Sequence, residues 1–252
     1  MLNTWQNVII ILLAVSASQL FMWALNRLWP SDKRHAHNDL IGWQLNIMGT
    51  TYAVILGFML YAVWNNVNTA NLNVENEANA LANIYRLAEG LPDPQRGQLK
   101  TLARSYADTV IDKDWPQMQA DQVPQESHHL NQDMWKTLMS LKNGSPTEIT
   151  AEDHALTELS VLTEHRRIRV VQNAFRLPAV LWCLLIIGGI VTITSAAMFG
   201  SANTSLHALQ VFTFTLFIVL VLVAIADINR PFQGSVHVSD FAFRRAQQTM
   251  KD

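Results

Sequence analysis

The chain has 252 residues, of which 50% are hydrophobic and 15% are charged, and its formal net charge is −2. Its single cysteine, Cys183, excludes an intrachain disulfide and gives no indication of an oxidising compartment.

Four stretches of the sequence lack Asp, Glu, Lys and Arg and have the roughly 20 residues that a bilayer crossing requires. They are residues 5–25, 41–64, 177–199 and 206–226. We therefore predict an all-α membrane protein with four transmembrane helices and a helical cytoplasmic insert. The predicted parts are a first helix pair (1–64), the insert (65–176), a second helix pair (177–226) and a C-terminal tail (227–252).

Basic residues beside the spans predict the orientation. With four crossings, both termini and the insert share one side of the membrane. Near the membrane ends that side holds Arg166, Arg167, Arg169, Arg176, Arg230, Arg244 and Arg245. The other side offers only Arg27, Lys33 and Arg34. Because cytoplasmic loops are rich in Lys and Arg, we expect the termini and the insert in the cytoplasm, with the protein in the inner (cytoplasmic) membrane.

The second span contains two neighbouring rows of residues at helical spacing. Small residues recur every four positions at Gly49, Ala53 and Gly57, a pattern along which another helix approaches closely. One position further on, a second row grows in bulk: Thr50, Val54 and Phe58. A ring of such helices would form a narrow apolar neck that is gated by dewetting. The alternative is that both rows only pack a helix bundle.

The insert begins as a continuation of the second span, over residues 65–88, and is crowded with asparagine. Asparagine is a poor helix former, so this enrichment asks for a reason. Four of the asparagines fall roughly on one helical face: Asn68, Asn76, Asn79 and Asn83. They are candidates for lining a wet vestibule, and the alternative is an ordinary solvated face.

Three more helices are predicted in the insert. Asp93 and Pro94 open one that ends at Trp115 and Pro116. A short one follows, with apolar positions from Leu130 to Leu141, and it stops at Asn143-Gly144.

The last helix of the insert is expected to start with a capping box of Thr150 and Asp153 and to run into the third span. On it, three arginines are spaced to share one face: Arg166, Arg169 and Arg176. Such a row would concentrate anions, bind lipid phosphates, or pair with Asp227 and the carboxylates of the insert. We favour lipid binding or pairing.

The sequence lacks the common enzymatic and metal-binding patterns. The sequence has no Gly-rich phosphate loop, nucleophile elbow or His-Glu-x-x-His helix. Its histidines at 128, 129, 154 and 165 have no Cys, Asp or Glu at a recognisable ligand spacing. We therefore expect neither an enzyme nor a metal site, and no cofactor.

The order of several short motifs resembles the bacterial bestrophin-like family along nearly the whole chain. They are residues 51–58 (TYAVILGF), Trp64-Asn65, Glu77-Ala78, residues 85–88 (YRLA), Trp115-Pro116 with Met118, Arg166 with Arg169, and Pro231-Phe232 with Gly234. Through that family the chain is distantly similar to bestrophins, which are pentameric chloride channels with four membrane segments and cytoplasmic termini.

The resemblance implies roles for particular residues. The Leu-Gly-Phe element of bestrophins matches residues 56–58, which places Thr50, Val54 and Phe58 at the neck. Their Asn-Pro-Phe-Gly element is similar to residues 229–234, close after Asp227, with an Arg and a Gln inserted here. Animal bestrophins continue with an acidic, calcium-holding run, whereas residues 235–243 contain only Asp240.

These observations lead to two hypotheses. The first is a homo-oligomeric channel, a pentamer by resemblance, that passes inorganic anions such as chloride and contacts membrane lipid. The second is a non-conducting membrane scaffold or sensor whose cytoplasmic helices bind a partner protein. We expect no nucleic-acid partner.

Overall fold

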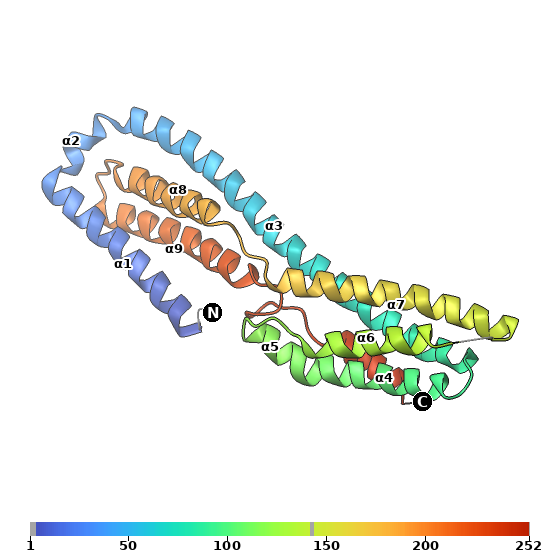
Figure 1. The fold of residues 1–252 in the computed structure, drawn as a ribbon. Helices are drawn as coiled ribbons and strands as arrows, with labels where there is room; N and C mark the ends of the chain where they lie inside the picture. The colour runs from blue at the N-terminus through green and yellow to red at the C-terminus, as the bar shows by residue number, and fades with distance from the viewer. Residues whose placement is uncertain (1–3, 142–143, 252) are drawn as a thin grey trace. The chain divides into compact units, whose positions relative to one another are not determined.

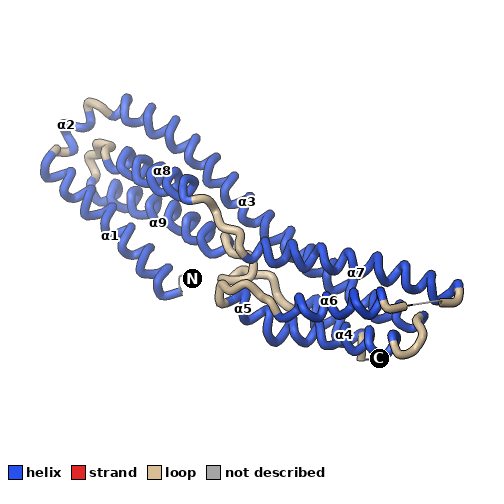
Figure 2. The backbone as a smooth tube through the Cα atoms, viewed as in Figure 1, coloured by secondary structure: helices blue, strands red, loops and turns tan. Residues whose placement is uncertain are grey.

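The computed structural model of the chain describes residues 4–141 and 144–251, and each regular element in those ranges is a helix (Figure 1). The elements in chain order are α1 (Thr4–Leu28), α2 (Ser31–His35), α3 (Asn38–Leu87), the 3-10 turn η1 (Ala88–Gly90), α4 (Gln95–Thr109), the π-helix η2 (Val110–Asp114), α5 (Trp115–Gln119), α6 (Glu126–Met139), α7 (Pro146–Asn173), α8 (Ala179–Ala197), α9 (Thr204–Ile228) and α10 (Phe241–Thr249). Figure 2 shows loops between these helices and no strand in the described ranges, which confirms the all-α class.

Among the described residues, four helices are long and apolar enough to cross a membrane. They are Trp5–Leu28, the apolar part of Asn38–Gly90, Ala179–Ala197 and Thr204–Ile228. Each contains most of one stretch that the sequence predicted, so the prediction of four transmembrane helices is confirmed.

Exposed tryptophans indicate where the membrane boundaries lie on α1 and α3. Trp5 and Trp23 are exposed on α1, and Trp43 and Trp64 are exposed on α3. At about 1.5 Å per residue, the two residues of each pair are separated by roughly 27 Å and 32 Å along the helix axis. These spacings match a hydrocarbon core of about 30 Å with tryptophan at both interfaces. The apolar part of α3 therefore ends near Trp64.

The chain forms two compact units, and α3 contributes to both. The first unit contains residues 1–64 and 176–229, and the second contains residues 65–175 and 230–252. In the first unit α9 packs against both α1 and α8 (Figure 1). Its main core cluster joins three helices through Tyr52, Leu56, Val63, Leu185, Ile218 and Ile225.

Tyr52 attaches the membrane part of α3 to α8. Its hydroxyl donates a hydrogen bond to the Leu185 carbonyl oxygen over 2.8 Å. The ring lies on Gly188 and Gly189, where a side chain has no room: a Cβ at Gly188 would come within 2.7 Å of the ring. Glycine at these two positions is what allows the tyrosine to fit.

Replacing Gly188 with Ala should therefore destabilise the first unit. We expect a loss of about 1–3 kcal/mol, because the added methyl overlaps a buried aromatic ring. Thermal unfolding of the purified protein in detergent measures the loss. Gly97→Ala is the matched control, since no atom lies within 4 Å of a Cβ there and Gly97 lies outside the row of small residues in α3. Equal unfolding temperatures for the two variants would contradict the packing described here.

Arg34 connects the C-terminal ends of α1 and α8 in the first unit. Its side chain is fully buried, and it donates one hydrogen bond to the Ala197 carbonyl oxygen over 2.9 Å and another to Asn26. Ala197 is the last residue of α8, and Asn26 lies in the last turn of α1. A guanidinium at helix C-termini is favourable because it satisfies free carbonyl groups and opposes the helix dipole. Arg34, predicted only as a loop charge, is thus a structural clamp.

The second unit contains the second half of α3 together with α4 to α7 and α10. Here α4 contacts α6 and α10, and α6 contacts α7. The fully buried side chains include Leu81, Ile84, Leu99, Tyr106, Met118, Met134, Leu138, Arg169, Phe232 and Phe243. Met134 and Leu138, from the apolar positions predicted between Leu130 and Leu141, are thus core residues.

Two predicted helix boundaries in the insert are wrong. Asp93 is not the N-cap, because α4 begins at Gln95 and its cap position is Pro94. Trp115 and Pro116 do not end the helix, which continues as η2 and then α5. Pro116 directly follows the π-helical turn, in which the Trp115 N–H bonds to the Val110 carbonyl oxygen, so the regular α-helical bonding is already interrupted there.

The boundaries of α7 also differ from the prediction. The capping box consists of Ser145 and Glu148 rather than Thr150 and Asp153. At the other end, α7 stops at Asn173 and α8 starts at Ala179, so the predicted continuous helix is interrupted. Pro178 explains the break, because proline disfavours the α conformation in the residue before it. The helix before α7 was predicted to stop at Asn143-Gly144, and Asn143 lies outside the described residues. In the structure this helix, α6, ends at Met139.

Candidate functional site

The predicted neck residues lie on an outward face of α3. Phe58 is 65% exposed and Val54 is 53% exposed, and Thr50 is exposed as well. All three are in the apolar part of the helix, on the side away from Tyr52 and Leu56, which are buried. Within one chain Val54 and Phe58 therefore face lipid or another molecule, whereas Thr50 lines an open cavity together with residues of α8 and α9 such as Ala196 and Phe214.

The neighbouring row of small residues also makes no close contact with another helix of its own chain. No atom lies within 4 Å of a Cβ built at Gly49 or Gly57, and Ala53 is exposed. Gly49 and Gly57 therefore do not pack closely against another helix of their own chain. The row remains available for close approach by a helix of another molecule.

The predicted asparagine row is accessible. Asn68, Asn76 and Asn79 are exposed, and Asn83 is half-buried. Asn73, by contrast, is buried and joins α3 to α7: its Nδ2 donates to the His165 carbonyl oxygen over 2.9 Å, and its Oδ1 lies 2.6 Å from His165 Nδ1. His165 is therefore occupied by a helix contact.

Arg169 lies at the centre of a buried network in the second unit. Its side chain is fully buried, with Nε 2.8 Å from Glu77 Oε2 and Nη2 3.2 Å from Asp114 Oδ2. Asp114 is the last residue of the π-helix η2. Burial lowers the pKa of Arg169, but the charge of Glu77 and its hydrogen bond outweigh burial, so the pKa is raised. The predicted lipid role of Arg169 is wrong, and pairing with carboxylates of the insert is what the structure shows.

The other two arginines of the predicted row have different environments. Arg166 Nε donates to Ser127 Oγ over 2.8 Å, and that hydroxyl donates to Asp114 Oδ2 over 2.5 Å. Arg166 is thus connected to the buried network. Arg176 lies three residues beyond the end of α7, so helical spacing no longer places it on the same face. The three predicted arginines therefore do not form one continuous surface.

Tyr106 completes the network, since its hydroxyl donates to Glu77 Oε1 over 2.7 Å. Burial, and then the charge of Glu77, raise the pKa of Tyr106 well above its ordinary value of 10.0. The unfolded chain therefore releases this proton at lower pH than the folded chain. Stability from this group is complete below pH 10 and falls as pH rises further, by about 1.4 kcal/mol per pH unit.

Tyr106→Phe should remove this part of the alkaline loss. We expect wild-type stability to fall more steeply than that of the variant between pH 10 and pH 11. The measurement is the free energy of unfolding against pH for both proteins. Parallel curves for the two proteins would contradict a raised pKa at Tyr106.

The residues of the C-terminal motif pack against the segment around α5. Phe232 is buried and meets Trp115 edge-on, with ring centroids 5.7 Å apart. Gln233 Nε2 donates to the Met118 carbonyl oxygen over 2.9 Å. The reversal that follows uses Gly234 at φ 92°, a left-handed conformation that favours glycine.

The other residues of this motif are Pro231, which is buried, and Asp227, which is half-buried near the end of α9. The inserted Arg230 donates to Gln233 Oε1 over 2.9 Å and lies 3.5 Å from Asp121. Asp240 pairs with Arg244 over 2.7 Å. No group of three or more potential metal-ligating side chains occurs in residues 4–141 and 144–251.

A model of the family described as Bestrophin-like domain matches residues 12–243 of the chain. No curated protein and no solved structure matches it.

Proposed function

The chain belongs to the bestrophin-like family, and we propose that copies of it assemble as a ring, of five subunits by resemblance, that passes anions such as chloride. The pore would be lined by α3. Thr50, Val54 and Phe58 would form its apolar neck, and conduction would require these three rings to wet. The termini and the second unit would lie in the cytoplasm, with the protein in the inner membrane.

One observation supports this proposal most strongly. The membrane part of α3 has one face in the core of its own chain and another face that is free. The free face combines glycines without any neighbour within 4 Å with an exposed phenylalanine. Small residues allow helices to approach closely, so the free face suits contact between copies of α3.

The exposed asparagines of α3 suit the wall of an aqueous path beyond the neck. Asn68, Asn76 and Asn79 are exposed on the polar half of α3. Neutral amides supply hydrogen-bond donors without fixing the sign of the passing ion. In the proposed channel they would line a vestibule that follows the neck.

Chloride flux from liposomes that contain the purified protein tests the function. We expect flux above that of empty vesicles. Its absence over a range of pH and calcium concentrations would count against a channel and favour the non-conducting scaffold. A wild-type protein that is only monomeric or dimeric in mild detergent would have the same implication, because a ring is then impossible.

Assembly through the small residues gives a further prediction. Gly57→Leu should preserve the fold of one chain, because a Cβ meets no atom there, but should block close approach of a second α3. We expect the ring to dissociate in mild detergent, as measured by light scattering after size exclusion. Gly97→Leu is the matched control, since Gly97 is equally open but lies on α4 in the second unit. An intact ring in Gly57→Leu would contradict the proposed interface.

A further inference from the structure

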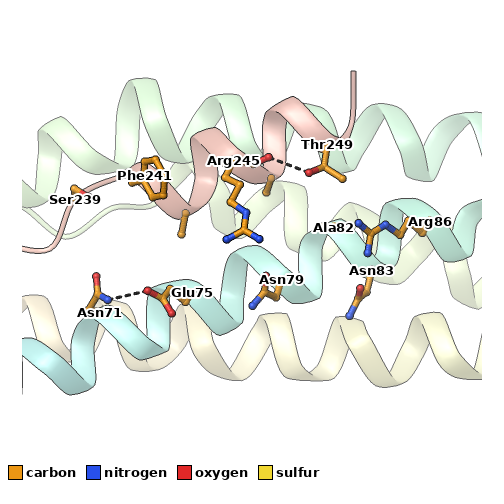
Figure 3. A pocket seen from close by; sticks show the side chains of 12 residues that line it. Asn71, Glu75, Asn79, Ala82, Asn83, Arg86, Ser239, Phe241, Arg245 and Thr249 are labelled. Atoms are coloured by element: carbon orange, nitrogen blue, oxygen red, sulfur yellow. Dashed lines mark hydrogen bonds between the residues drawn. The ribbon is translucent and has the colours of Figure 1, made fainter. Parts of the chain in front are cut away.

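A polar groove lies between α3 and α10 in the second unit, and its volume is about 530 Å³ (Figure 3). This size is within the range of roughly 300–1,000 Å³ that is typical of small-molecule sites. Two of the predicted vestibule residues, Asn79 and Asn83, line it together with residues of α10. Neither side-chain amide has a hydrogen-bond partner among the described residues, so both are available to a ligand.

Two arginines give the groove an unbalanced positive charge. Arg86 on α3 and Arg245 on α10 both line it, and Figure 3 shows Arg245 extending from α10 toward α3. Neither guanidinium forms an ion pair or a hydrogen bond within residues 4–141 and 144–251. The neighbouring Arg244, in contrast, is paired with Asp240 over 2.7 Å. The two guanidiniums in the groove thus lack an anion.

The other end of the groove has a different chemistry. Phe241 lines it and is 68% exposed, so one face of its ring is open to a ligand. Opposite lies Glu75, whose Oε1 accepts a hydrogen bond from Asn71 over 2.9 Å. Phe241 and Arg245 are four residues apart on α10, so they lie on one face about 6 Å apart along the axis. The aromatic ring of Phe241 and the guanidinium of Arg245 therefore lie side by side in the groove.

We propose that this groove binds a small organic anion in which a phosphate group is attached to a flat ring. The guanidiniums of Arg86 and Arg245 would hold the phosphate, because their planar donor groups match its oxygen atoms. The ring would lie on Phe241, and Asn79 and Asn83 would donate hydrogen bonds between the two ends. This binding goes beyond the proposed channel activity and does not depend on conduction.

Isothermal titration of the purified full-length protein in detergent tests the inference, with phenyl phosphate as the probe. We expect saturable binding that Arg245→Gln weakens by roughly 10-fold or more, since hydrogen bonds to charged groups are lost. Arg86→Gln should act in the same direction. Phe241→Ala should weaken phenyl phosphate but leave inorganic phosphate unchanged. Arg244→Gln is the matched control and should bind as the wild type does.

Three outcomes would overturn the inference. They are no saturable binding of phenyl phosphate, equal effects of Arg244→Gln and Arg245→Gln, and binding of inorganic phosphate as tight as that of phenyl phosphate. Helicity and elution volume verify that the variants are folded, which is expected because the substituted side chains are exposed. A protein that binds the probe but shows no chloride flux would contradict the channel and leave this site standing.

Discussion

Replacing Arg169 with Met is expected to destabilise the second unit by about 3–5 kcal/mol, because two buried carboxylates lose their shared cation. Glu77 and Asp114 are both fully buried, and each lies within 3.2 Å of the guanidinium. Without it, the two negative charges stay in a region that water does not reach. Thermal unfolding in detergent should show a fall in Tm of about 10 °C or more.

Arg167→Met is the control for this experiment. Arg167 is on the same helix two residues away, but it is exposed. Its replacement removes the same charge from the chain and should change Tm by less than about 2 °C, since exposed charges contribute little. Similar Tm values for the two variants would contradict the structural role of Arg169. The Tm of Glu77→Gln should lie between the Tm values of Arg169→Met and Arg167→Met, because the amide retains some of the hydrogen bonds without the charge.

Phe58→Ala is expected to raise chloride flux by about 10-fold, which corresponds to a barrier lower by about 1.4 kcal/mol. Phe58 is the bulkiest of the three predicted neck residues. In a ring, its replacement would widen the apolar constriction on every subunit and make it easier to wet. The measurement is the initial rate of chloride efflux at equal protein content per liposome.

Phe21→Ala is the matched control, because Phe21 is an exposed phenylalanine in the membrane helix α1. It has no place in the proposed neck, and its flux should equal that of the wild type. If Phe58→Ala leaves the flux unchanged, Phe58 is not the gate. If both variants raise the flux equally, the effect comes from general disturbance of the membrane helices.

Much of the fold was predictable because membrane helices leave a strong signal. Length and lack of charge identified the four spans, and the absence of Pro and Gly between Asn65 and Ala88 predicted that α3 continues past Trp64. The break between α7 and α8 was missed although Pro178 signals it. The capping box was predicted at Thr150 and Asp153, whereas Ser145 and Glu148, which have the same three-residue spacing, form it.

The candidate site was less predictable, because helical spacing shows which residues share a face but not what that face contacts. Arg166 and Arg169 do share a face, yet that face meets Glu77 and Asp114 in the core rather than lipid. One signal was available: Glu77 is a carboxylate between Val74 and Leu81 in the apolar row of α3, where a charge needs a partner. The fit of Tyr52 onto Gly188 has no local signal, since the residues are far apart in sequence.

The proposed channel depends on Phe58 pointing at an aqueous path. Cysteine modification tests this directly. The native Cys183 is first replaced by Ser, which leaves Phe58→Cys as the only thiol in the chain. A charged, membrane-impermeant thiosulfonate should then react at position 58 and reduce chloride flux through liposomes. If the thiol at position 58 remains unmodified while the protein is assembled in the membrane, Phe58 faces lipid and the proposed pore is wrong.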